Sequence, residues 1–243
     1  MSATNSKPEV YVLGNGRSLK DFDFKRFGDD TITIGCCLAY RHWEAIDWYP
    51  TFYVNVDNVV LKHNEKAIRN MILDKKCKGF LLSKSIMEDW DHFDIKKHEN
   101  VFFLEDLRCN PFSLFKNLFN FCSGSVAALF GCDIGSKVHL MGFDLDYVEL
   151  IPECMEKEDG VLVITSTPET NPNYFCDNYQ QVGDHYNKPN GKSVHNQSWK
   201  ELKLILNFTE TLFNVKIPVM NYNPKESISE YFETKTLEDL PLQ

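Results

Sequence analysis

The sequence lacks the features that mark several protein classes. It contains no run of 18 apolar residues and no apolar stretch at its N-terminus, so it predicts neither a transmembrane helix nor a signal peptide. Basic residues are in deficit, because 26 Lys and Arg stand against 35 Asp and Glu, giving a formal net charge of -9. Nucleic-acid binding depends on neutralising phosphates, and this balance disfavours such a partner. We expect a soluble, cytoplasmic protein.

The eight cysteines show no metal-binding or disulfide pattern. None is spaced as Cys-x-x-Cys, and Cys36 and Cys37 are adjacent, a spacing that does not suit a zinc site. We therefore expect reduced thiols in or near a core. Hydrophobic residues make up 43% and charged residues 25% of the 243, which is ordinary globular composition. This length suits one large domain, or one domain with a small lid.

Six short apolar runs recur between helical or loop segments, and most of them are apolar on both faces. Such runs are typical of a parallel sheet covered by helices on both sides, so we predict an α/β fold with a single Rossmann-like, mostly parallel sheet. The runs lie at 10–14, 31–35, 51–55, 79–83, 101–105 and 137–142. Helices are expected at 66–76, 125–133 and 198–213, followed by a last strand at 215–222 that Pro218 would place at the edge of the sheet.

Residues 149–194 interrupt this pattern. The segment has few apolar runs and many turn-forming residues, and a loop of that length in a compact domain is usually functional or disordered. Aromatic residues in and just before it, Tyr147, Tyr174, Phe175, Tyr179 and Tyr186, argue for order, because disordered segments are poor in aromatics. We predict one catalytic domain over residues 1–243 with a lid at about 149–194.

The first strand ends at Gly14-Asn15-Gly16, where a helix is expected to begin. Two glycines after a strand form half of a dinucleotide-binding fingerprint, but Leu19 stands where the third glycine would be needed. The turn can therefore be a phosphate-binding loop or a purely structural one. Asn15 offers both a hydrogen-bond donor and an acceptor at the edge of the sheet where α/β proteins bind ligands.

A second group of polar residues lies in the middle of the chain. Residues 123–125, Ser-Gly-Ser, precede a predicted helix and supply either a helix cap or ligand-binding hydroxyls and amides. The next predicted strand ends at Gly142, with Asp144 and Asp146 just beyond it. Asp-x-Asp spacing can hold a divalent metal through carboxylate oxygens, and the alternative is a pair of structural or hydrogen-bonding carboxylates.

His195 precedes the last long helix by three residues and follows turn-rich chain. An imidazole there can face a cleft, and its ordinary pKa suits proton transfer near neutral pH. The alternative is an exposed or capping histidine, and His185 competes for the same catalytic role.

The order of these motifs between residues 9 and 228 resembles the bacterial sialyltransferases that extend lipooligosaccharides. It is more loosely similar to the CMP-Kdo transferases of capsule and lipopolysaccharide synthesis. The matching motifs are the G-N-G-x-S-L turn at 14–19, Ser123-Gly124, Gly142-Phe143-Asp144, the tyrosine-containing lid and His195. Departures occur at Cys37, where the family has an asparagine, at 120–122, where an arginine is absent, and at Asp146, where a tyrosine is expected.

The resemblance implies a glycosyltransferase that uses a CMP-activated sugar acid and a glycan or glycolipid acceptor. His195 would be the general base, and the implied nucleotide- and donor-binding residues are Gly14, Asn15, Gly16, Ser18, Asn55, Ser123, Gly124, Tyr174, Tyr179 and Tyr186. Asp144 would meet the cytidine, and Asp144 or Asp146 near the anomeric carbon would permit a retaining, covalent route. Tyrosine donors to the departing phosphate imply that neither a metal nor another cofactor is required. The resemblance is also compatible with oligomers and with a position close to a membrane that carries the acceptor.

Two alternatives stay open on the sequence alone. One is a metal-dependent nucleotide-sugar transferase that uses Asp144 and Asp146. The other is a nucleotide- or sugar-binding module without catalysis, although a lid rich in aromatics and a well-placed histidine exceed what such a module needs.

Overall fold

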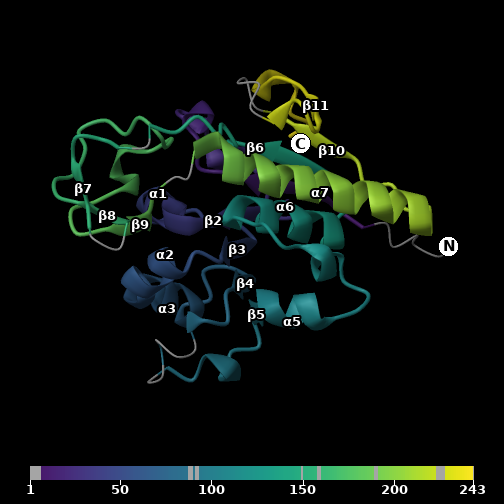
Figure 1. The fold of residues 1–243 in the computed structure, drawn as a ribbon, viewed down its shortest axis with the longest axis horizontal. Helices are drawn as coiled ribbons and strands as arrows, with labels where there is room; N and C mark the ends of the chain where they lie inside the picture. The colour runs from purple at the N-terminus through teal and green to yellow at the C-terminus, as the bar shows by residue number, and fades with distance from the viewer. Residues whose placement is uncertain are drawn as a thin grey trace.

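The computed structural model describes residues 7–86, 90, 93–148, 150–157, 160–188, 191–222 and 228–242, of which 191–194 are described by their backbone alone. Its main element is an eight-stranded parallel sheet in the order β11-β10-β6-β1-β2-β3-β4-β5 (Figure 1). All six apolar runs form strands of this sheet, as predicted. They are β1 (Glu9–Leu13), β2 (Ile32–Cys36), β3 (Phe52–Asn55), β4 (Gly79–Leu82), β5 (Val101–Phe103) and β6 (Lys137–Met141), joined by β10 (Val219–Asn221) and β11 (Glu233–Thr234).

The prediction that the strand at 215–222 lies at the edge of the sheet is wrong. β11 pairs in parallel with the outer side of β10, which is therefore the second strand from the end of the sheet. Pro218 precedes β10, and its carbonyl oxygen accepts a hydrogen bond of 2.9 Å from the Val138 amide. Because proline lies outside the strand, its missing N–H removes no hydrogen bond between strands.

Helices cover both faces of the sheet. α6 (Ser123–Ile134) and α7 (Gly191–Phe213) lie along one face (Figure 1), together with α5 (Leu104–Cys109). The other face carries α1 (Tyr40–Ala45), α2 (Asn58–His63) and α3 (Glu65–Leu73). Alternate strand residues point to opposite layers: Val10 and Val12 pack with α6 and α7, whereas Tyr11 and Leu13 pack with α1 to α3. This arrangement explains why the strands are apolar on both faces.

Short 3-10 helices fill many of the connections: η1 (Arg17–Leu19), η2 (Phe24–Arg26), η3 (Cys37–Ala39), η4 (Ile95–Lys97), η5 (Leu114–Asn117), η6 (Asp177–Tyr179) and η8 (Leu237–Asp239). The helix expected directly after the first strand is one of them, since η1 is a single three-residue turn. None of the described helices is long and apolar enough to cross a membrane.

The strand order reverses between β1 and β6. From β1 the chain adds β2 to β5 on one side, and the later strands β6, β10 and β11 lie on the other. Open α/β sheets bind ligands at such a switch point, outside the carboxyl ends of the strands. In this chain those ends carry Gly14-Asn15 after β1 and Gly142 after β6.

Residues 150–157 and 160–188, called the insert below, contain a separate antiparallel sheet. Its strands are β7 (Cys154–Glu156), β8 (Val161–Ile164) and β9 (His185–Asn187), and they lie at one end of the molecule (Figure 1). Glu149, 158–159 and 189–190, which belong to the predicted lid, lie outside the described residues. The described residues of the insert are thus ordered, and its function as a lid stays a prediction. The predicted end of the lid at 194 is wrong, because α7 begins at Gly191.

Candidate active site

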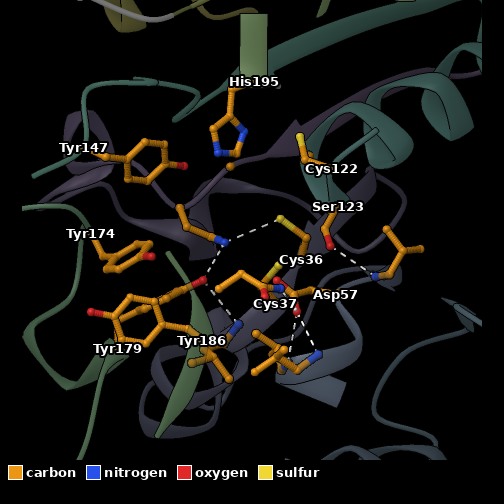
Figure 2. Close-up of a pocket in the computed structure, with 18 of the residues that line it drawn as sticks. Cys36, Cys37, Asp57, Cys122, Ser123, Tyr147, Tyr174, Tyr179, Tyr186 and His195 are labelled. Atoms are coloured by element: carbon orange, nitrogen blue, oxygen red, sulfur yellow. Dashed lines mark hydrogen bonds between the residues drawn. The ribbon is translucent and has the colours of Figure 1, made fainter. Parts of the chain in front are cut away.

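A cavity of about 590 Å³ opens at the switch point of the sheet. Four loops that follow the carboxyl ends of β1, β2, β3 and β6 line it, together with the first residues of α6 and the N-terminal half of α7. The insert closes the remaining side (Figure 2). Of the predicted site residues, Gly14, Asn15, Ser123, Gly124, Tyr174, Tyr179, Tyr186 and His195 are among those that line the cavity.

The glycines after β1 pack against the turn after β6. The amides of Gly14 and Gly16 each donate a 2.7 Å hydrogen bond, to the carbonyl oxygens of Met141 and Gly142. A Cβ on Gly14 would lie 2.3 Å from the Gly142 carbonyl oxygen, so only glycine allows this approach. Both amides therefore have acceptors within the protein, so the turn packs β1 against β6, and its role in binding a phosphate stays a prediction.

The other five predicted residues, Gly16, Ser18, Asn55, Asp144 and Asp146, are not among the cavity-lining residues. Asp144 is buried, and its carboxylate accepts hydrogen bonds from the Ser18 amide at 2.8 Å and from the Ser18 hydroxyl. Asn55 is fully buried, donates to the Tyr53 hydroxyl and accepts from the Asp57 amide, both at 3.1 Å. Asp146 is exposed. Asp144 and Asn55 therefore shape the loops around the cavity.

Asn15 connects the first strand to the insert. Its side-chain amide donates to the Tyr179 hydroxyl at 2.8 Å and contacts the Cys36 sulfur at 3.5 Å, while its backbone carbonyl accepts from the Phe175 amide at 3.1 Å. The side-chain oxygen of Asn15 is buried and has no hydrogen-bond partner among the described groups. It is an acceptor that a ligand in the cavity can satisfy.

Four tyrosines form one wall of the cavity (Figure 2). The rings of Tyr174 and Tyr179 stack with centroids 3.8 Å apart, and the Tyr147 ring meets Tyr174 edge-on at 6.4 Å. Burial raises the pKa of Tyr147, Tyr174, Tyr179 and Tyr186 well above the ordinary value, so all four hydroxyls keep their protons at neutral pH. Tyr147 joins the three tyrosines that the sequence singled out, and they offer hydroxyl donors to an anionic ligand.

His195 lies within α7, which begins at Gly191, and not before the helix as predicted. The residue lines the cavity, and its ring centroid is 5.3 Å from that of Tyr147. Its Nδ1 atom is buried and has no partner among the described groups. Burial lowers the pKa of His195, but the interaction of its ring with the neighbouring Cys122 side chain outweighs burial and raises the pKa. In turn, burial raises the pKa of Cys122 while His195 lowers it, and the net value is about 7.

Arg41 and Asp57 also fasten the insert to the main domain, in addition to Asn15, through polar contacts at the cavity rim. Arg41 of α1 pairs with the buried carboxylate of Asp184, with one bond of 2.8 Å, and donates a 2.7 Å bond to the Tyr179 carbonyl. Asp57 caps α2 and accepts a 3.0 Å bond from the Asn187 side chain.

Cationic side chains are scarce around the cavity. Lys188 is the only lysine or arginine among the described residues that line it, and it lies 3.3 Å from Glu156. The sequence did not single out Lys188, Asp57, Asp184 or Cys122, because none of them belongs to a local motif. The fold and the site together define an α/β protein with a tyrosine-walled cavity at the switch point of a parallel sheet.

Neither a protein-family model nor a curated protein matches the sequence. Solved structures do match its fold. The monofunctional alpha-2,3-sialyltransferase Cst-I from Campylobacter jejuni aligns with a TM-score of 0.51 at 14% identity, over 96% of this chain and 81% of that one. The sialyltransferase CST-II in complex with trisaccharide acceptor and CMP aligns with a TM-score of 0.50 at 14% identity, over 93% and 85% of the two chains. The chain therefore has the fold of these sialyltransferases, as the sequence motifs predicted.

Proposed function

We propose that this protein is a glycosyltransferase that transfers a sugar acid, of the sialic acid or Kdo type, from a CMP-activated donor to a glycan hydroxyl. The observation that carries the proposal is a pair of buried, unpartnered polar atoms in one cavity, Asn15 Oδ1 and His195 Nδ1. Leaving such an atom unsatisfied costs about 1–3 kcal/mol, which a polar ligand recovers. The fold supports a CMP donor, because CST-II binds CMP on the same architecture.

In the proposed complex the nucleotide lies across the carboxyl ends of β1 to β3. Asn15 and the start of α6 at Ser123-Gly124 contact the nucleotide, and tyrosine hydroxyls donate to its phosphate. Lys188 provides a positive charge for the anionic donor. The acceptor hydroxyl gives its proton to His195 as its oxygen attacks the anomeric carbon, and the C–O bond to phosphate breaks with both electrons leaving on CMP. Attack opposite the leaving group inverts the anomeric carbon.

Nucleotide specificity is the first test. We expect CMP to raise the melting temperature of the purified protein more than CDP, UDP or GDP at equal concentration, because a ligand stabilises the folded state according to its occupancy. Calorimetric titration with CMP then gives the affinity directly. A shift with UDP alone would exclude a CMP donor.

The catalytic base is the second test. His195→Ala should lower transfer from CMP-sialic acid or CMP-Kdo by roughly 10²–10⁴-fold, the usual contribution of general base catalysis, and leave CMP affinity nearly unchanged. His185→Ala is the matched control, since His185 belongs to the insert and does not line the cavity. Loss of transfer in His185→Ala, with full activity in His195→Ala, would reassign the base.

The transfer assay on the wild-type protein is repeated with a chelator. Activity that disappears with the chelator and returns with manganese would favour the metal-dependent alternative.

A further inference from the structure

Cys122 lies where the first turn of α6 meets the N-terminal half of α7. It is the residue before α6, and its amide donates a 3.0 Å hydrogen bond to the Ser125 hydroxyl. Its sulfur is 3.6 Å from the hydroxyl oxygens of both Ser125 and Ser198. Ser198 in turn donates a 2.7 Å bond to the carbonyl oxygen of His195. The thiol thus lies between α6 and α7 and contacts Ser198, which is one helical turn after His195 on α7.

The thiol faces the same part of the cavity as the His195 ring (Figure 2). Among the described residues, two titratable groups lie beside this ring: Tyr147, whose ring centroid is 5.3 Å away, and Cys122, which acts on the imidazole from the start of α6. Because burial keeps Tyr147 protonated, Cys122 is the one of the two that can carry a charge near neutral pH. The cavity-lining carboxylates have other partners, since Asp184 pairs with Arg41 and Asp57 caps α2.

A histidine base works best when a neighbouring group orients its ring and stabilises the imidazolium that forms on proton uptake. We propose that Cys122 is the positioning residue for His195 in the transfer reaction, with its thiolate in the place that a carboxylate takes in other histidine-based sites. When His195 accepts the proton of the acceptor hydroxyl, the thiolate stays unchanged and forms an ion pair with the new imidazolium. The catalytic part of this inference rests on the proposed function. The interaction between the Cys122 and His195 side chains does not depend on that function.

The contact makes a prediction about the histidine alone. Removing the thiol in Cys122→Ala leaves burial as the main influence on His195, so the pKa of the imidazole should fall. Cys122→Ser keeps a hydrogen-bonding group without the charge, and the pKa should fall in this variant too. The pKa is followed by NMR titration of ring-labelled histidine in the wild type, in both variants and in the control Cys109→Ala, whose thiol is exposed on α5.

The thiol gives an independent measurement. Alkylation of Cys122 by iodoacetamide, followed by mass spectrometry, should reach half its maximal rate near pH 7 in the wild type, and His195→Gln should move this midpoint to higher pH. An unchanged His195 pKa in Cys122→Ala, or an alkylation midpoint insensitive to His195→Gln, overturns the proposal. Neither measurement uses a nucleotide sugar, so a protein that binds no CMP would overturn the proposed function and leave this contact standing.

The catalytic part is tested on the pH profile of kcat. In Cys122→Ala the acid limb of this profile should move to lower pH, because the pKa of His195 falls. The plateau of kcat should fall about tenfold, equivalent to about 1.4 kcal/mol of activation free energy. Cys122→Ser should recover part of the plateau without restoring the acid limb. A purely structural role would lower the melting temperature or raise KM but leave the acid limb in place, and that result overturns the proposed positioning role.

Discussion

At position 16 a side chain would collide with the loop after β6. A Cβ there would lie 2.5 Å from the carboxyl carbon of Asp144, which holds the Ser18 amide and hydroxyl. We therefore expect Gly16→Ala to lower the free energy of unfolding by about 1–3 kcal/mol, the usual cost of overpacking, as measured by urea denaturation. Gly28→Ala is the control, because its nearest neighbour would be the Thr31 hydroxyl at 3.9 Å. Equal losses in the two variants would contradict the packing role of Gly16.

Single residues were only partly predictable from the sequence. The turn at Gly14-Asn15-Gly16 could be recognised, but a local motif does not distinguish a glycine needed for binding from one needed for close packing. Asp144 shows the same limit, since its Asp-x-Asp spacing indicates a metal while its carboxylate binds Ser18. Cys122 carries no sequence signal at all, because its partner His195 is brought to it only by the packing of α6 against α7.

At the scale of elements, Arg41 fastens the insert to α1. Its guanidinium is largely buried with Asp184, donates to the Tyr179 carbonyl and reaches Asn64. Arg41→Gln leaves the Asp184 carboxylate buried without its charge partner, a change that costs about 3–5 kcal/mol in buried pairs. We expect faster hydrogen exchange in residues 179–187 and weaker CMP binding.

The exposed pair between Lys84 and Asp106 provides the matched control for this variant. Lys84→Gln should leave both the exchange of the insert and the melting temperature unchanged, because solvent screens exposed ion pairs. If Arg41→Gln changed exchange in β4 as strongly as in residues 179–187, the pair would stabilise the whole domain and would not fasten the insert.

Elements of the main sheet were predictable for a physical reason. Parallel strands covered on both faces must be apolar throughout, and six such runs mark β1 to β6 within one or two residues. The strands of the insert have three or four residues, and two of them contain exposed positions, Met155 and Glu156 in β7 and Asn187 in β9. Such short segments do not differ in sequence from turns, so the insert could be predicted as ordered but not as a sheet.

At the scale of the whole molecule, the cavity lies between two structural units of different size, the domain built on the eight-stranded sheet and the insert with its three-stranded sheet. One wall consists of loops anchored in the eight-stranded sheet, and the other is the insert, which meets that sheet through Asn15, Arg41 and Asp57. A ligand that satisfies Asn15 and the tyrosine wall would touch both units at once. Bound nucleotide should therefore restrain the insert more than the sheet, whose strands are already buried.

This difference predicts a pattern of hydrogen exchange. Saturating CMP should slow exchange in residues 174–188 of the insert and in the loops after β1 and β2, because these segments line the cavity. Residues 205–213, the C-terminal half of α7, lie outside the cavity and serve as the internal reference. Asn15→Ala should weaken the protection of the insert at equal CMP concentration, since it removes both the unpartnered acceptor and the donor to Tyr179. Uniform protection across the chain, or protection confined to the reference segment, would show that CMP binds elsewhere or does not connect the insert to the sheet.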